Sequence, residues 1–541
     1  MRKILASAEK IVDALFEKKV GVLVWAMSFA GIVGLRTFIE GIVVPVKDTI
    51  PGIVVDYLHY LIFFLILFLL VWLILKFFLK IQPEKLAFLL LAAAWLIIFP
   101  PLFDLLKTGG QIYWSFYLLD NIRALMSQYI TVFGNLPTGV MYFGTKILFI
   151  SAVILVSGII FLKTKDSLKF LASLLLTYTV FFILASFPSW LAYIYYFLAQ
   201  NKPISEVKSF HVVELFGGPK QIFGLPALDM KYVFAFNLNQ IYYPVLLFLL
   251  CWLFWLISKQ KFLAVLKNSR LPQLIYHAGL LLVGLGLGFL AFPDNFNLNI
   301  FSLFTVFDLL VAIVLAWIAS VIINDVHDYG IDMVSNAWRP LQQSVFGVKE
   351  YHDFGVLLFL LSLLGGLVVG VKFALVFVVY QFLAWAYSAP PFRLKQFPVI
   401  ATLVSSLASL LIVLLGFFIF SGDNNIGGLP WRVMLLLVLA LTLSLPIKDF
   451  KDIAGDKKEG VRTIPVIFGE ANGRLIVASG IFISFMASVF LLNEFRLFWW
   501  AVIFGAAAFW IVLNKKPHQL FWWVMGAVAI YGVILVKILF L

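Results

Sequence analysis

Long apolar stretches dominate this chain and leave it few possible folds. A run of about 20 apolar residues is long enough to cross a bilayer as a helix. In lipid every backbone N–H and C=O must find a partner inside the protein, which favours helices. Hydropathy predicts about six spans before residue 258 and about nine after it, near residues 20–46, 54–79, 86–106, 139–162, 168–198, 238–257, 273–292, 301–323, 353–371, 373–389, 398–420, 432–447, 472–492, 495–513 and 520–540. The sequence therefore predicts an all-α polytopic membrane protein.

Composition supports this class. Hydrophobic residues make up 63% of the chain and charged residues only 12%, whereas a soluble domain has about 25% charged residues. The net charge of +13 suits loops that face anionic lipid headgroups. We expect no nucleic-acid partner, because no soluble segment interleaves basic and aromatic residues. The single cysteine, Cys251, excludes an intrachain disulfide.

Charge also divides the chain and orients it. The segment 258–272 carries four basic residues and no acidic one, so we predict a basic cytoplasmic linker there. It would join an N-terminal multi-span membrane domain (1–257) to a C-terminal domain (273–541). With the spans above, the lysine-rich loops all fall on one side of the membrane. The positive-inside rule makes that side cytoplasmic.

Two short acidic segments interrupt the apolar sequence. They are NDVHDYGID at 324–332 and KDFKDIAGD at 448–456, each with three aspartates. The chain has 27 acidic residues among 541, so a window of nine holds fewer than one on average. Carboxylates are costly near a membrane unless they are paired, solvated or bound to a metal. Both segments fall on the predicted cytoplasmic side, at the ends of apolar spans.

The spacing within each segment places its polar residues on one helix face. Asn324, Asp328 and Asp332 recur every four residues, and the second set has the spacing i, i+3, i+7; its members are Asp449, Asp452 and Asp456. Mg²⁺ is usually held by one or two carboxylates together with substrate phosphates. Either segment alone could be a solvated turn. Two of them on one membrane face predict a magnesium site that faces an anionic substrate.

A third polar segment, YSAPPFRLK at 387–395, lies between the acidic ones. Pro390 and Pro391 break the helix before them, and Arg393 and Lys395 follow in a short loop. Guanidinium and ammonium groups suit phosphate oxygens, so these bases would steady a diphosphate; ordinary positive-inside anchoring is the alternative. Tyr387 would orient substrate or stabilise positive charge through its ring, unless it is simply an interfacial aromatic.

These residues resemble a known family. NDVHDYGIDMVSNAWRPL resembles the Asn-Asp-x-x-Asp-x-x-x-Asp motif, with its following Arg-Pro, of the UbiA superfamily of intramembrane prenyltransferases. KDFKDIAGDKKEGVRTIPVIFG resembles the second aspartate motif of that superfamily, and YSAPPFRLK resembles its Tyr-Ser-x-Pro-Pro segment. The resemblance covers about residues 262–541 and implies a nine-helix bundle there. A roughly six-helix membrane domain, outside the resemblance, would precede it.

The resemblance implies Mg²⁺-dependent transfer of a prenyl group from an allylic prenyl diphosphate to a lipid-like or aromatic acceptor. One metal-diphosphate wall would comprise Asn324, Asp325, Asp328 and Asp332, and the other Asp449, Asp452 and Asp456. All of these except Asp325 would be metal ligands, while Asn324 and Asp325 would contact the diphosphate. Asp328, Asp452 and Tyr387 would take part in catalysis. Arg393 and Lys395 would neutralise the leaving diphosphate, with Arg339 as a weaker candidate.

Other readings stay open. The bundle could be a membrane transporter or an inactive scaffold, and a carbocation formed in it could cyclise instead of being transferred. The N-terminal half could bind the acceptor, recruit a partner protein or stabilise the assembly.

Two features of the apolar spans predict packing instead of chemistry. Gly284, Gly286 and Gly288 would permit close helix contact. Arg36 and Glu40, spaced i, i+4, would neutralise each other inside a span.

Overall fold

All regular elements in the described part of the chain are helices. The structure, a computed structural model, describes residues 2–43, 50–109, 121–134, 143–218, 230–421, 426–451, 453–458 and 460–540. In these ranges, 15 helical segments are long and apolar enough to cross a membrane, six of them before residue 258 and nine after it. The predicted all-α membrane class is therefore confirmed.

The described residues separate into two compact units. Unit 1 contains the described residues up to 263 together with 303–308, and unit 2 contains the others from 264 onward. Most of the predicted linker is a short helix, α12 (Lys259–Asn268). Its apolar residues form one run, 262–266, of which Val265 is buried.

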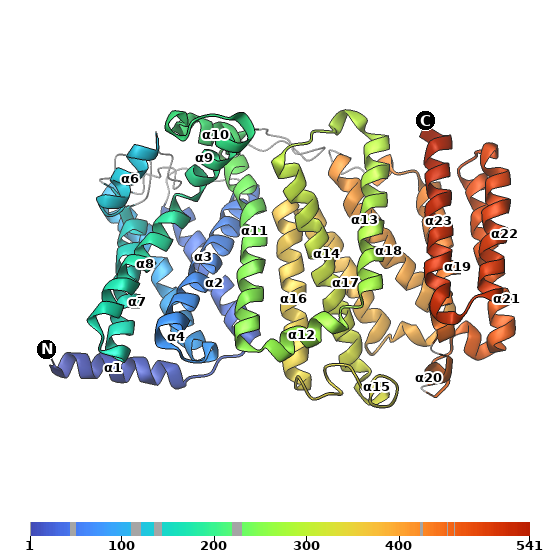
Figure 1. Cartoon of the computed structure of the whole chain (residues 1–541), viewed down its shortest axis with the longest axis horizontal. Helices are drawn as coiled ribbons and strands as arrows, with labels where there is room; N and C mark the ends of the chain where they lie inside the picture. Colours follow the sequence, from blue (N-terminus) through green and yellow to red (C-terminus); the bar gives the residue numbers. More distant parts are fainter. Residues whose placement is uncertain are drawn as a thin grey trace. The chain divides into compact units, whose positions relative to one another are not determined.

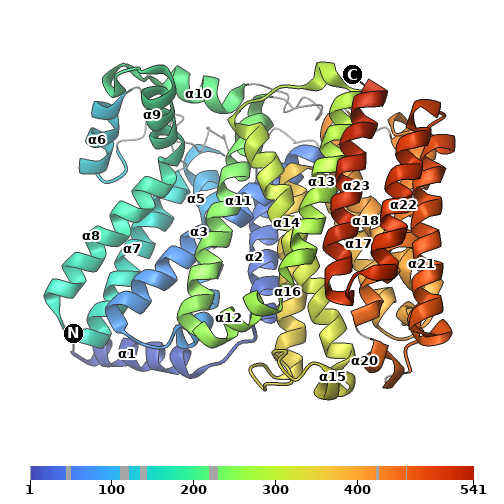
Figure 2. The same ribbon diagram turned by 45° about the vertical axis from the view of Figure 1, so that its right-hand side comes forward.

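Unit 1 is built mainly from eleven α-helices. They are α1 (Arg2–Glu17), α2 (Val22–Val43), α3 (Ile50–Leu79), α4 (Ala87–Ala94), α5 (Phe99–Thr108), α6 (Ile122–Ile130), α7 (Phe143–Thr164), α8 (Ser167–Ala185), α9 (Phe187–Gln200), α10 (Ser209–Gly217) and α11 (Met230–Ile257). Helix α1 lies across the ends of α4 and α7 (Figures 1 and 2). Ion pairs from Lys163 to Asp13 and from Lys165 to Glu9 attach it to the α7–α8 turn.

The predicted ion pair inside unit 1 forms. Arg36 Nη1 lies 2.6 Å from Glu40 Oε2, and the Arg36 guanidinium lies 3.7 Å from the centroid of the Tyr60 ring. The Tyr60 hydroxyl donates to Glu40 Oε1 at 2.9 Å. The charges therefore compensate each other within the unit.

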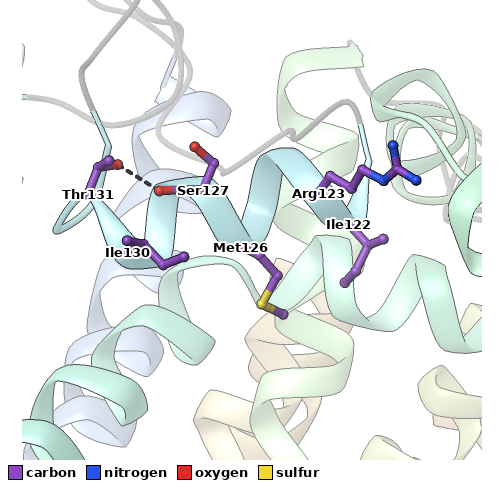
Figure 3. A pocket seen from close by; sticks show the side chains of 6 residues that line it. All are labelled: Ile122, Arg123, Met126, Ser127, Ile130 and Thr131. Carbon is purple, nitrogen blue, oxygen red and sulfur yellow. Dashed lines mark hydrogen bonds between the residues drawn. The ribbon is translucent and has the colours of Figure 1, made fainter.

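An open groove of about 420 Å³ lies along α6 (Figure 3). It is lined by Ile122, Arg123, Met126, Ser127, Ile130 and Thr131. None of the residues predicted for a metal or diphosphate site lines it.

Unit 2 contains the remaining α-helices, apart from residues 303–308 of α14. They are α13 (Leu271–Ala291), α14 (Ile300–His327), α15 (Tyr329–Ser335), α16 (Val348–Val369), α17 (Val371–Ser388), α18 (Pro398–Phe420), α19 (Trp431–Ser444), α20 (Ile453–Lys458), α21 (Ile464–Leu491), α22 (Phe498–Asn514) and α23 (Pro517–Phe540). A core of buried apolar residues joins α21, α22 and α23, including Ile481, Ala508 and Val524.

Glycines bring α13 and α18 into backbone contact. A Cβ atom added at Gly284 would overlap the carbonyl oxygen of Val413, and one added at Gly416 would overlap that of Leu281. At Gly288 it would lie 2.9 Å from the Phe417 carbonyl oxygen. Gly286 has nothing within 4 Å of the same position, so the packing prediction is confirmed for two of the three glycines and is wrong for Gly286.

This contact predicts a contrast between neighbouring glycines. Gly284→Ala should lower the stability of the protein by about 1–3 kcal/mol or more, because backbone atoms cannot move aside for the new methyl group. Gly286→Ala, the matched control, should be neutral or stabilise by up to about 1 kcal/mol. Thermal unfolding of both variants in nanodiscs measures the difference, and equal midpoints would contradict the close contact.

Candidate functional site

The first acidic segment lies where α14 ends and α15 begins. The helical hydrogen-bond pattern continues across this junction: the Asp328 amide donates to the Asn324 carbonyl and the Asp332 amide to the Asp328 carbonyl, both at 2.9 Å. The chain therefore continues through the junction with helical hydrogen bonding. The break in helical geometry falls at Asp328, with φ −100° and ψ 13°.

The predicted basic loop reaches this segment. Lys395 Nζ lies 3.2 Å from Asn324 Oδ1 and also contacts Asp328 Oδ2. Arg393 Nη2 lies 3.3 Å from Asp328 Oδ1, and the Ser388 hydroxyl donates to Asn324 Oδ1 at 3.2 Å. Residues about 65 positions apart in the sequence thus lie together at this site.

The double proline explains this placement. Helix α17 ends at Ser388, and Ala389 before Pro390 is extended, with φ −104° and ψ 150°. The chain then turns so that the Arg393 amide donates to the Ala389 carbonyl at 2.8 Å. Arg393 itself has a left-handed backbone, φ +41°, which non-glycine residues adopt only where the surroundings hold them.

Asp325 faces another side of the helix and another set of cations. Its side chain is fully buried. Oδ1 accepts from Arg339 Nη1 at 2.9 Å and from Arg270 Nη2 at 3.5 Å, and Oδ2 accepts from Asn268 Nδ2 at 2.6 Å. Asn268 Nδ2 also donates to the Tyr351 hydroxyl at 3.0 Å.

Three of these partners were not predicted from the sequence. Arg270 was assigned only to the basic linker, and Asn268 and Tyr351 carried no signal of their own. The sequence offered one signal for Arg270: it is a charged residue directly before Leu271–Pro272, where the first span of the C-terminal domain begins.

Burial affects the ionisable groups that lie outside the spans. Burial raises the pKa of Asp332 to about 6, although Arg339 beside it acts in the opposite direction. The Arg339 guanidinium contacts Asp332 Oδ2, and Asn336 Nδ2 donates to Oδ1 at 2.9 Å. Burial likewise lowers the pKa of the Lys395 ammonium, against the attraction of Asp328. At both groups desolvation therefore shifts the pKa more than the neighbouring opposite charge does.

The aspartates of the first acidic segment contact more basic side chains than their own number. Asp325, Asp328 and Asp332 contact a total of four basic side chains, namely Arg270, Arg339, Arg393 and Lys395. The Nε–H groups of Arg339 and Arg393 are buried and have no hydrogen-bond partner among the described residues. A buried donor without a partner is costly. Both features suit an anionic ligand that would accept from these guanidinium groups.

The second acidic segment spans a 3₁₀ stretch (Leu445–Lys451) and α20. Asp452 lies outside the described residues. The Thr463 hydroxyl donates to Asp456 Oδ2 at 3.3 Å. Helices α15 and α20 lie near each other at the same end of unit 2 (Figures 1 and 2). Within the described ranges, however, no three His, Cys, Asp or Glu side chains lie close enough together to hold a metal ion.

Side chains of the first segment fit a cation. Asn324 Oδ1 and Asp328 Oδ2 both contact one ammonium group, that of Lys395. Two hard oxygen donors thus point at one cation, which is the donor chemistry that Mg²⁺ prefers. Asp332 is occupied by Arg339 and Asn336. Tyr387, the remaining predicted residue, is half-buried near the end of α17.

Comparison with known proteins agrees with the motifs. Residues 274–535 match the family model described as the UbiA prenyltransferase family. The digeranylgeranylglyceryl phosphate synthase of Methanosphaera stadtmanae is 31% identical over 147 residues, which is 27% of this chain and 52% of that protein. The 2-acyl-4-prenylphloroglucinol 6-prenyltransferase of Humulus lupulus is 31% identical over 208 residues, covering 36% and 50%. The chain thus spans about half the length of these two relatives.

A solved structure is also similar. The UbiA homologue from Archaeoglobus fulgidus bound to GPP and Mg²⁺ is 20% identical, with 50% of this chain and 96% of that chain covered and a TM-score of 0.40. The family match and the two aspartate motifs therefore agree that residues 274–535, in the C-terminal half of this chain, are similar to the UbiA prenyltransferase family.

Proposed function

We propose that the UbiA domain transfers a prenyl group from an allylic prenyl diphosphate to a lipophilic acceptor, with Mg²⁺ as cofactor. The observation that carries the proposal is the meeting of Asn324 and Asp328 with Lys395 and Arg393. It combines oxygen donors for a metal with fixed cations for a diphosphate. The named relatives include a glyceryl phosphate synthase and a prenylphloroglucinol prenyltransferase, so the acceptor class stays broad.

The residues of this chain would divide the work as follows. Mg²⁺ would be held by Asn324, Asp328 and Asp332 and, from the second segment, by Asp449, Asp452 and Asp456; when bound, it would stabilise the negative charge of the diphosphate. Arg393 and Lys395 would bind diphosphate oxygens as the allylic C–O bond breaks and charge grows on them.

The apolar spans and Tyr387 would protect an allylic carbocation formed at the site. The apolar spans of unit 2 would exclude water from an allylic carbocation, and the Tyr387 ring would stabilise its positive charge. We further propose that the site faces the cytoplasm, because the lysine-rich loops fall on the same side in the span count.

The shared contact with Lys395 predicts competition between metal and ammonium. In the absence of metal, Lys395→Met should lower the free energy of unfolding by roughly 1–3 kcal/mol, because the buried oxygens of Asn324 and Asp328 lose a hydrogen-bond donor. Added Mg²⁺ should then stabilise this variant more than the unsubstituted protein, since binding to the folded state adds stability by mass action. Thermal unfolding with EDTA and with Mg²⁺ measures both effects.

The matched control is Lys349→Met, since Lys349 is exposed at the start of α16. This control should change stability by less than about 0.5 kcal/mol in either condition. A Lys395→Met variant that responds to Mg²⁺ no more than the control does would count against a metal at Asn324 and Asp328.

A transfer assay tests the activity itself. Purified protein in nanodiscs receives labelled prenyl diphosphates of several lengths, a lipid extract and Mg²⁺. Diphosphate release and a new labelled lipid should both require the metal. Both should fall by about 100-fold or more in Asp328→Ala and in Asp452→Ala, because each variant loses charge stabilisation in the transition state.

Asp353→Ala serves as the control for that assay, because Asp353 lies outside both acidic segments, beside His352 on α16. Its activity should stay within a factor of about two. Transfer that persists in both motif variants would rule out the two-wall site.

A further inference from the structure

Asp325 is the most enclosed acidic group at the candidate site. Its side chain has no exposed surface, whereas that of Asp328 is 11% exposed. Each of its carboxylate oxygens already accepts hydrogen bonds from nitrogen donors of the chain. Asp328 is also paired with two cations, but its side chain keeps some exposed surface, whereas a metal ion could reach Asp325 only if these buried contacts opened. Asp325 would also repel a diphosphate, because both groups are anions.

The donors to Asp325 come from separate elements of unit 2. Asn268 is the last residue of α12, Arg270 precedes α13, and Arg339 lies in the loop between α15 and α16. Tyr351 on α16 accepts from the same Asn268 amide, at 3.0 Å. A single carboxylate on α14 therefore fixes two arginines that are far apart in the sequence.

Arg270 shows how strongly this arrangement is held. Its φ is +57°, in the left-handed region, which a non-glycine residue keeps only where surrounding contacts impose it. Its side chain is still 29% exposed. Arg339 also carries a buried Nε–H without a partner among the described residues. Arg270 thus has exposed surface that could meet an anion, and Arg339 has a donor whose hydrogen bond is not made in this structure.

We propose that Asp325 is a positioning residue that orients Arg270 and Arg339 toward the diphosphate and itself binds neither metal nor substrate. This assigns the second residue of the Asn-Asp motif a different role from its neighbour. Asn324 Oδ1 contacts Lys395 and Ser388, which Asp325 does not. Asn324 and Asp325 have different partners because adjacent helix residues point about 100° apart. The inference rests on the proposed function, since it assumes that a diphosphate binds at this site.

Binding measurements on the full-length protein in nanodiscs test this without requiring catalysis. Mn²⁺ affinity is measured first by electron paramagnetic resonance, and pyrophosphate affinity is then measured by calorimetry at saturating metal. Asp325→Asn should leave Mn²⁺ affinity within a factor of about two and weaken pyrophosphate binding about tenfold. Asp328→Asn should weaken Mn²⁺ binding about tenfold.

A double variant tests the coupling to the arginine. If Asp325 acts partly through Arg339, Asp325→Asn should weaken pyrophosphate binding less in the Arg339→Gln background than in the unsubstituted protein. Asn268→Ala removes one hydrogen bond to Asp325 without changing any charge. It should cause a smaller loss of pyrophosphate affinity in the same direction, and it covers the case in which Asp325→Asn does not fold.

Three results would overturn the inference. The first is that Asp325→Asn loses as much Mn²⁺ affinity as Asp328→Asn does. The second is that pyrophosphate affinity is unchanged in both Asp325→Asn and Asn268→Ala. The third is that the effects of Asp325→Asn and Arg339→Gln add up in the double variant. Normal binding without prenyl transfer would sink the proposed function alone. Absence of metal-dependent pyrophosphate binding by the unsubstituted protein would sink both.

Discussion

Compensation of buried carboxylates by fixed cations is the interaction on which the candidate site depends. Removing one partner of a buried ion pair costs about 3–5 kcal/mol, because a charge is left without compensation. At the end of α14, three aspartates are nearly enclosed, and each contacts at least one guanidinium or ammonium group. The cations come from the start of α13, from the loop after α15 and from the loop after α17. The first acidic segment therefore ties together the chain segments that surround it.

The same compensation gives the site two faces. On one, Asn324 and Asp328 contact the Arg393–Lys395 loop. On the other, Asp325 contacts Arg270 and Arg339. The two faces follow from helix geometry, since neighbouring residues point in directions about 100° apart. A bound metal would thus meet the oxygens of Asn324 and Asp328 on the first face. A diphosphate would meet arginines from both faces.

Local rules made much of this arrangement predictable. The helix break at Pro390 and Pro391 follows from proline chemistry, and it explains why Arg393 and Lys395 leave the helix together. Four-residue spacing placed Asn324 and Asp328 against the same lysine. Asp332, beyond the helix break at Asp328, instead shares Arg339 with Asp325. Apolar length alone predicted the membrane class.

Other features depend on tertiary contacts that a single sequence does not encode locally. Nothing at Asn268 or Tyr351 indicates a partner more than 50 residues away, and Arg270 looks like any other base of the segment 258–272. Asp325 was grouped with its motif neighbours, although helix geometry turns it toward different partners. Gly286 shares a pattern with Gly284 and Gly288 but faces open space; the pattern does not reveal which side of the helix meets α18.

The most direct test of this account is a cryo-electron microscopy structure of the full chain with Mg²⁺ and a prenyl thiodiphosphate, which is cleaved slowly. The account predicts metal density against Asn324 and Asp328, with the Lys395 ammonium shifted from Asp328 to the diphosphate. Arg270 and Arg339 should still hold Asp325. A bound thiodiphosphate with no metal at Asn324 and Asp328, and with Lys395 still paired to Asp328, would contradict it.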